Sequence, residues 1–302
     1  MNKSIIAVFL SLAIIGCGGE QESSSTHLDT REVNTTLEDH NVTQVDNNTT
    51  IPSENNNTTL QLSETLQVYY ADALDKNESA LKSSLHRIIL QSKFLTYSEA
   101  YTAMGLTNKD LKSRDEEKVI LFYSQESVLA ADKCHTISPD GCWNREHLWP
   151  KSLGVGYDDS VASYTDLHHL QPANAQVNMD RSNRRFSKAT TPYIKIDDFY
   201  YDDSRWSWEV ADDLKGDVAR AMLYMVVRYE GESGEPDLEL YAHDESTERP
   251  ADLCEMLEWN RMDRVSNSEI RRNEIIYQYQ NNRNPFIDNN EWVDLIWISK
   301  CE

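Results

Sequence analysis

The sequence predicts an α+β domain that is mostly helical and contains one small antiparallel sheet. Segments with apolar residues at helical spacing outnumber the short apolar or extended runs that are typical of strands. No internal repeat interrupts residues 66–302, and this length is enough for one large domain with a sizeable core.

The first 17 residues have the pattern of an export signal. Lys3 precedes an apolar run from Ile5 to Ile15, which is too short to span a bilayer. The run ends in a segment that resembles a bacterial lipobox, so we expect Cys17 to be lipidated. The protein is then an outer-membrane lipoprotein, facing the periplasm or the cell surface. The alternative is cleavage near Gly16 and release of a free secreted protein.

Residues 18–65 are rich in Asn, Thr, Ser and Glu and poor in aromatics, which predicts a disordered tether. The net charge is −22 for the whole chain, and the remaining domain keeps 42 acidic and 27 basic residues, or −15. This balance argues against binding nucleic acid through a broad basic surface. A site that acts on nucleic acid must therefore use local cations and a metal ion.

The first elements of the domain are two helices and a strand. Helical spacing of apolar residues predicts a helix over Asn77–Gln91. Thr96 and Glu99 form the pattern of a capping box, which predicts a short helix that ends near Gly105. The compact apolar run Val119–Tyr123 is the best candidate for a strand.

The middle of the domain predicts a hairpin followed by a helix. Trp143–Trp149 and Leu167–Leu170 are short extended pieces joined by a turn-rich loop, and Asn174–Arg185 follows as a helix. Further on, Asp217–Tyr229 has the pattern of a mostly buried helix, and a last helix is expected over Asn267–Gln280 with Ser266 and Glu269 as its capping pair.

Four cysteines lie in the domain, and an even number behind an export signal suggests disulfides. Sequence proximity favours Cys134–Cys142, which leaves Cys254–Cys301 to hold the C-terminus. Four cysteines allow three pairings, so the connectivity stays open at this point.

The hairpin and helix can bring Glu146, His147 and Asn178 to one point. Glutamate and asparagine oxygens suit a hard cation such as Mg²⁺, and a neutral histidine suits general base catalysis. Adjacent residues of a regular strand point to opposite faces, so we expect irregular backbone at Glu146-His147. The plainer alternatives are a solvated Glu-His pair, a surface amide at Asn178, and a structural zinc site or one buried and one exposed histidine at His168-His169.

Three segments together resemble the endonuclease I family of bacterial periplasmic and extracellular nucleases, which belongs to the His-Me finger (ββα-metal) group. They are Asn-Arg-Glu-His-Leu-Trp-Pro-Lys-Ser (144–152), Asp-Leu-His-His-Leu (166–170) and Val-Asn-Met-Asp-Arg-Ser-Asn (177–183). Similarity extends over about residues 67 to 298.

The resemblance implies three roles. His147 deprotonates the attacking water, and Glu146 and Asn178 hold one Mg²⁺, with Mn²⁺ or Ca²⁺ as alternatives. His168 and Asp166 support the site. The family's usual activity is cleavage of DNA, and often RNA, with little sequence preference.

One departure from the family pattern concerns the phosphate. Some members place an arginine in an insert between the two halves of the motif, but residues 151–165 contain none. Lys151 and Arg181 are the candidates to replace it. We expect a monomer that touches a membrane only through its lipid anchor. The competing functions are a surface DNA-binding or uptake lipoprotein without cleavage and a phosphodiesterase for small nucleotides.

Overall fold

The structure is a computed structural model that describes residues 62–302, except 115, 135–140, 159, 191–193 and 197–198. The predicted signal, the lipidation site Cys17 and nearly all of the predicted tether lie outside the described residues. Helix α1 (Glu64–Tyr69) begins two residues before the predicted domain start, because the side chain of Ser63 caps it by accepting from the amide of Leu66.

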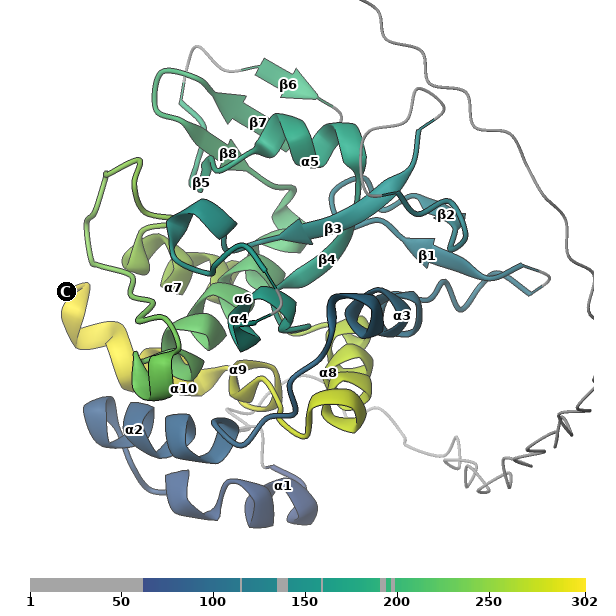
Figure 1. Cartoon of the computed structure of the whole chain (residues 1–302). Coiled ribbons are helices and arrows are strands. Elements are labelled where there is room, and N and C mark those ends of the chain that lie inside the picture. The colour runs from purple at the N-terminus through teal and green to yellow at the C-terminus, as the bar shows by residue number, and fades with distance from the viewer. Residues whose placement is uncertain (1–61, 115, 135–140, 159, 191–193, 197–198) are drawn as a thin grey trace, which may run out of the picture. The chain divides into compact units, whose positions relative to one another are not determined.

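One group of helices packs around α6, whose side chains are almost all buried, while α3 and α8 pack on each other in a second apolar cluster. Helices α2, α7 and α9 contact α6 directly, and α10 packs on α2 and α7 (Figure 1). None of the helices in the described part of the chain is long and apolar enough to cross a bilayer. The helices after α1 are α2 (Glu78–Ile89), α3 (Tyr97–Thr107), α4 (Ala162–Thr165), α5 (Ala175–Arg181), α6 (Lys215–Arg228), α7 (Leu253–Met262), α8 (Asn267–Gln280), α9 (Pro285–Asp288) and α10 (Glu291–Trp297).

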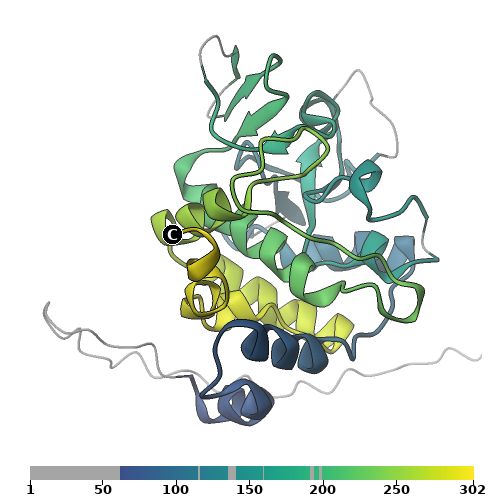
Figure 2. The same cartoon turned by 90° about the vertical axis from the view of Figure 1, so that its left-hand side faces the viewer.

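The described strands form three small sheets. Two are antiparallel pairs, β1–β2 and β3–β4, and the third has the order β5-β8-β7-β6 with a parallel β5–β8 pair. Most of the helices and the four-stranded sheet lie at opposite ends of the domain, with the β3–β4 pair between them (Figures 1 and 2). The strands are β1 (Lys118–Ile120), β2 (Ser127–Leu129), β3 (Trp143–His147), β4 (Leu170–Asn174), β5 (Arg185–Phe186), β6 (Ile194–Ile196), β7 (Phe199–Asp202) and β8 (Ser207–Glu209).

The α+β class and four of the predicted helices are confirmed. The capping boxes of α3 and α8 form as predicted, with Thr96–Glu99 and Ser266–Glu269 exchanging side-chain and backbone hydrogen bonds. Helix α8 is not the last helix, because α9 and α10 follow it.

Three predicted bounds near the hairpin are wrong, each for a local reason. Only the start of Val119–Tyr123 is strand, since the chain turns after Ile120. Leu167–His169 is a turn, because the Asp166 carboxylate accepts the amide of His168, and β4 begins only at Leu170. The following helix is shorter than predicted, as described next.

The residue on each side of helix α5 sets where the helix begins and ends. Asn174 is the cap rather than a helical residue, and its side chain accepts the amides of Gln176 and Val177. The helix ends at Arg181, because Ser182 has a positive φ of 54°.

Both predicted disulfides are present. Cys134–Cys142 spans the residues just before β3, and Cys254 on α7 joins Cys301 after α10. The second bridge fixes the C-terminal helices to the core at α7.

Candidate active site

Strand β3 is the centre of the candidate site. It pairs in regular antiparallel register with β4 as far as His147, which faces Leu170. The predicted irregular backbone at Glu146-His147 is therefore wrong. Alternation along the strand directs Glu146 toward α5, where it contacts Arg181, and His147 toward the opposite side, where it contacts Tyr164.

A pocket of about 660 Å³ nevertheless reaches residues from both faces of β3. The predicted site residues Glu146, His147, Asn178 and Lys151 all line it. Strand alternation does not keep these side chains out of a common pocket, because the pocket lies where β3 ends and α5 approaches it.

His147 is buried and has a fixed hydrogen-bonding role. Its Nε2 lies 3.0 Å from the carbonyl oxygen of Tyr164, and since a carbonyl only accepts, Nε2 carries the proton. The remaining ring nitrogen, Nδ1, is then the acceptor. Burial, and to a smaller extent His169 and Lys151, hold the pKa of His147 well below its usual 6.5. The imidazole is therefore neutral at pH 7 and able to accept a proton.

Glu146 is also buried, at 1% exposure. Its Oε1 accepts from the hydroxyl of Tyr123 at 2.7 Å and from Nη1 of Arg181 at 3.0 Å. Burial raises the pKa of this carboxyl, and Arg181 and Tyr123 oppose the shift. A divalent cation beside the carboxylate would oppose it further.

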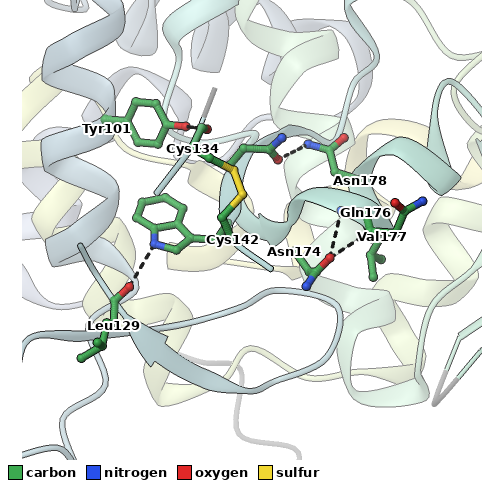
Figure 3. The surroundings of a disulfide bond; sticks show 10 residues. Tyr101, Leu129, Cys134, Cys142, Asn174, Gln176, Val177 and Asn178 are labelled. Carbon is green, nitrogen blue, oxygen red and sulfur yellow. Dashed lines mark hydrogen bonds between the residues drawn. A yellow bond between two sulfur atoms is a disulfide. The ribbon is translucent and has the colours of Figure 1, made fainter. Parts of the chain in front are cut away.

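Asn178 reaches the same region from α5. Its Nδ2 donates to the carbonyl of Arg145 at 3.1 Å. It also donates to Oδ1 of Asn144 at 2.7 Å, which is the dashed line drawn from Asn178 in Figure 3. The carbonyl partner identifies this atom as the amide nitrogen, so Oδ1 is the atom left for other partners. Figure 3 also shows the Cys134–Cys142 disulfide beside this bond, and Cys134 lines the pocket.

The donor set fits a hard divalent cation. A carboxylate oxygen and an amide oxygen are the ligands that Mg²⁺, Mn²⁺ and Ca²⁺ take in proteins. In the described part of the chain, the candidate site included, no group of three or more His, Cys, Asp or Glu residues is placed to hold a metal. A cation at Glu146 and Asn178 would therefore take its remaining ligands from water and phosphate.

Comparison with known proteins identifies the family. A family model described as Endonuclease I matches residues 77–291. The chain belongs to the endonuclease I family. It is a nuclease, and nucleic acid is its substrate. The alternative of an uptake protein without cleavage is therefore wrong.

Three relatives illustrate the similarity. Extracellular ribonucleases of Bacillus amyloliquefaciens and Bacillus subtilis (strain 168) are 45% identical over 234 residues and 47% identical over 232 residues, each covering 76% of this chain and 78% of the relative. An endonuclease-1 of Buchnera aphidicola subsp. Baizongia pistaciae (strain Bp) is 30% identical over 132 residues, which is 41% of this chain and 46% of the relative.

Of the two cations predicted to bind phosphate in this endonuclease I family member, only Lys151 lines the pocket. It is exposed at the start of a 3₁₀ turn, Lys151–Leu153, with Nζ 5.8 Å from the ring centre of Tyr164. Arg181 is fully buried, and its guanidinium donates to Glu146 and to the carbonyls of His147 and Leu148. The prediction that Arg181 contacts phosphate is therefore wrong.

Asp166 and His168 lie in the core and do not line the pocket. The Asp166 carboxylate accepts from the hydroxyls of Tyr224 and Tyr229 and from Gln280. Any support they give the site passes through the turn that leads into β4. Both His168 and His169 are buried, so the alternative of one exposed histidine is wrong.

Sequence reasoning missed two residues that shape the site. The sequence predicts only a strand at Tyr123, and nothing in it connects this residue with Glu146. Arg145 also lines the pocket, with its guanidinium carbon 2.8 Å from the ring centre of Tyr97 and 3.7 Å from that of Tyr101. Its position directly before Glu146 in the motif was the available signal.

Proposed function

We propose that this endonuclease I family member is an exported, divalent-metal-dependent endonuclease that hydrolyses phosphodiester bonds in RNA and DNA with little sequence preference. One observation carries the proposal. A neutral imidazole, a buried carboxylate and an amide oxygen from two chain segments line one pocket. The order of β3, β4 and α5, with His147 ending the first strand and Asn178 on the helix, supports a His-Me finger.

The proposed roles follow from the atoms that remain available. Nδ1 of His147 takes a proton from the attacking water, which makes the water a better nucleophile. Glu146 and Asn178 would hold the cation, which when bound would neutralise charge on the phosphate and stabilise the leaving oxygen. Lys151 attracts the phosphate to the mouth of the pocket. The hairpin fixes the spacing of the base and the metal ligands.

RNA is included because the two Bacillus relatives are named ribonucleases. The structure gives no basis for base discrimination, and contacts to the backbone alone carry no sequence information. Matched digestion of a structured RNA and a linear DNA of equal length measures the preference.

Export is supported by two disulfides, which persist in oxidising compartments, and by the extracellular relatives. Lipidation of Cys17 and a monomeric state remain predictions, and the relatives lend no support to an outer-membrane location.

The first test replaces His147 with alanine. General base catalysis contributes about 10²–10⁴-fold, so His147→Ala is expected to lose that much rate while it still binds Mn²⁺. The measurement is cleavage of plasmid and RNA by purified protein with Mg²⁺, and His243→Ala, outside the pocket, is the control. Near-normal activity of His147→Ala, or cleavage that is indifferent to EDTA, contradicts the proposal.

A further inference from the structure

The side-chain donors around Glu146 meet at one of its two oxygens. Tyr123 and Arg181 both donate to Oε1, at 2.7 and 3.0 Å, and neither reaches Oε2. A carboxylate held in this way presents its second oxygen in a defined direction. Glu146 lines the pocket, and Oε2 is the oxygen that receives no side-chain hydrogen bond.

Both donors are themselves fixed. The ring of Tyr123 is buried and packs edge-on against Phe122 and Trp208, with ring centres 5.3 and 5.6 Å apart. Arg181 is fully buried and anchored by the carbonyls of His147 and Leu148. Because Tyr123 and Arg181 are held in place, rotation of the Glu146 carboxylate would break its hydrogen bonds to both of them.

Hydrogen bonds orient the side-chain amide of Asn178 in the same way. Its nitrogen donates to Asn144 and to the carbonyl of Arg145, which leaves Oδ1 unassigned. Each ligand predicted for the metal is thus held by partners that do not themselves supply the ligating oxygen.

We propose that Tyr123 and Arg181 are positioning residues that hold Glu146 for a divalent cation, and that Asn144 holds Asn178 in the same way. This inference rests on the proposed function, because it assumes that Glu146 and Asn178 are the metal ligands. Partners of this kind fix the geometry of a ligand and reduce the ordering needed when the metal binds.

The test compares two buried tyrosines. Tyr123→Phe removes one hydroxyl and keeps the ring. Tyr70→Phe is a matched control, because the Tyr70 hydroxyl donates to Asp288, also at 2.7 Å, and neither of these two residues lines the pocket. Mn²⁺ affinity is measured by electron paramagnetic resonance on purified protein without substrate. Tyr123→Phe is expected to weaken Mn²⁺ binding by about 10–100-fold, while Tyr70→Phe leaves it unchanged.

A kinetic readout separates positioning from folding. The Mg²⁺ concentration for half-maximal rate is expected to rise in Tyr123→Phe by the same factor, while kcat at saturating Mg²⁺ stays within a few-fold of wild type. Asn144→Ala, which removes the acceptor for Asn178, is expected to weaken Mn²⁺ binding by a smaller factor, because the Arg145 carbonyl remains.

The outcomes distinguish this inference from the proposed function. The positioning roles are overturned if Mn²⁺ affinity is equal in Tyr123→Phe, Asn144→Ala and Tyr70→Phe. In that case Glu146 and Asn178 are still the proposed metal ligands. Unchanged Mn²⁺ affinity in Glu146→Gln, or a wild type that binds no Mn²⁺, overturns the metal site itself and with it the proposed function.

Discussion

At the scale of single residues, one property is common to His147, Glu146 and Asn178. Each uses part of its polar side chain in hydrogen bonds to neighbouring residues, so only the remaining polar atoms are available to water or a metal ion. The residue types and their convergence on one pocket could be predicted from the sequence. Their partners could not, because Tyr123 and Tyr164 approach from segments whose positions depend on the fold. Arg181 shows the same limit, because nothing in the sequence indicates that its side chain is fully buried.

Lys151 is the residue whose prediction as a phosphate contact can be tested most directly. It is exposed, so Lys151→Ala is expected to change the free energy of unfolding by less than about 0.5 kcal/mol. Loss of one phosphate contact should weaken substrate binding for all sequences and lower the salt dependence of log K by about one. Binding titrations at several salt concentrations measure this, with the exposed Lys300→Ala as control. If the salt dependence of log K is unchanged, another cationic side chain makes the phosphate contact.

Elements were predicted best where their signals were local. The capping boxes of α3 and α8 involve residues three apart, and both formed as expected. The four-stranded sheet was missed because its strands are only two to four residues long and its parallel β5–β8 pair joins segments about twenty residues apart. The start of β4 was misplaced because the Asp166 turn competes with extended backbone.

The two disulfides are expected to differ in what they stabilise. Chain entropy predicts a loss of about 4 kcal/mol on removing Cys254–Cys301, with a separation of 47 residues, and about 2.6 kcal/mol for Cys134–Cys142, with a separation of 8. Urea unfolding of the two double Cys→Ser variants measures the difference. Because Cys134 lines the pocket, its variant should also lose activity at temperatures where it remains folded. Equal activity losses in both variants would contradict this separation of roles.

The whole domain is acidic, with a net charge of −15 in residues 66–302, although its substrate is a polyanion. Long-range attraction therefore cannot bring nucleic acid to the protein, and the favourable electrostatics must be confined to the pocket. Arg145 and Lys151 are the cationic residues of the described chain that line it. Affinity should therefore depend strongly on the bound cation.

The stability of the molecule should fall in mild acid. Burial lowers the pKa values of both His168 and His169 from 6.5 to about 4. Between these values the unfolded chain binds protons that the folded chain excludes, so stability is fully present above pH 6.5 and is lost as the pH falls toward 4. Each histidine accounts for about 3 kcal/mol at most.

Urea midpoints measured between pH 7 and pH 4.5 check this expectation. The midpoint should decline steadily as the pH falls. His169→Gln should be less stable at pH 7, but its midpoint should decline less, because this variant has one group fewer that takes up a proton on unfolding. A constant midpoint between pH 7 and pH 5 would show that these imidazoles titrate normally in the folded protein.

The hydrogen bond from His147 Nε2 to the Tyr164 carbonyl has a last consequence for turnover. In the proposed mechanism each cycle leaves an extra proton on Nδ1, and the opposite nitrogen cannot relay it inward, since its neighbour is a carbonyl. The proton must return to bulk water by the route through which the substrate entered. We therefore expect deprotonation of the imidazolium and departure of the cleaved strand to use the same opening of the pocket.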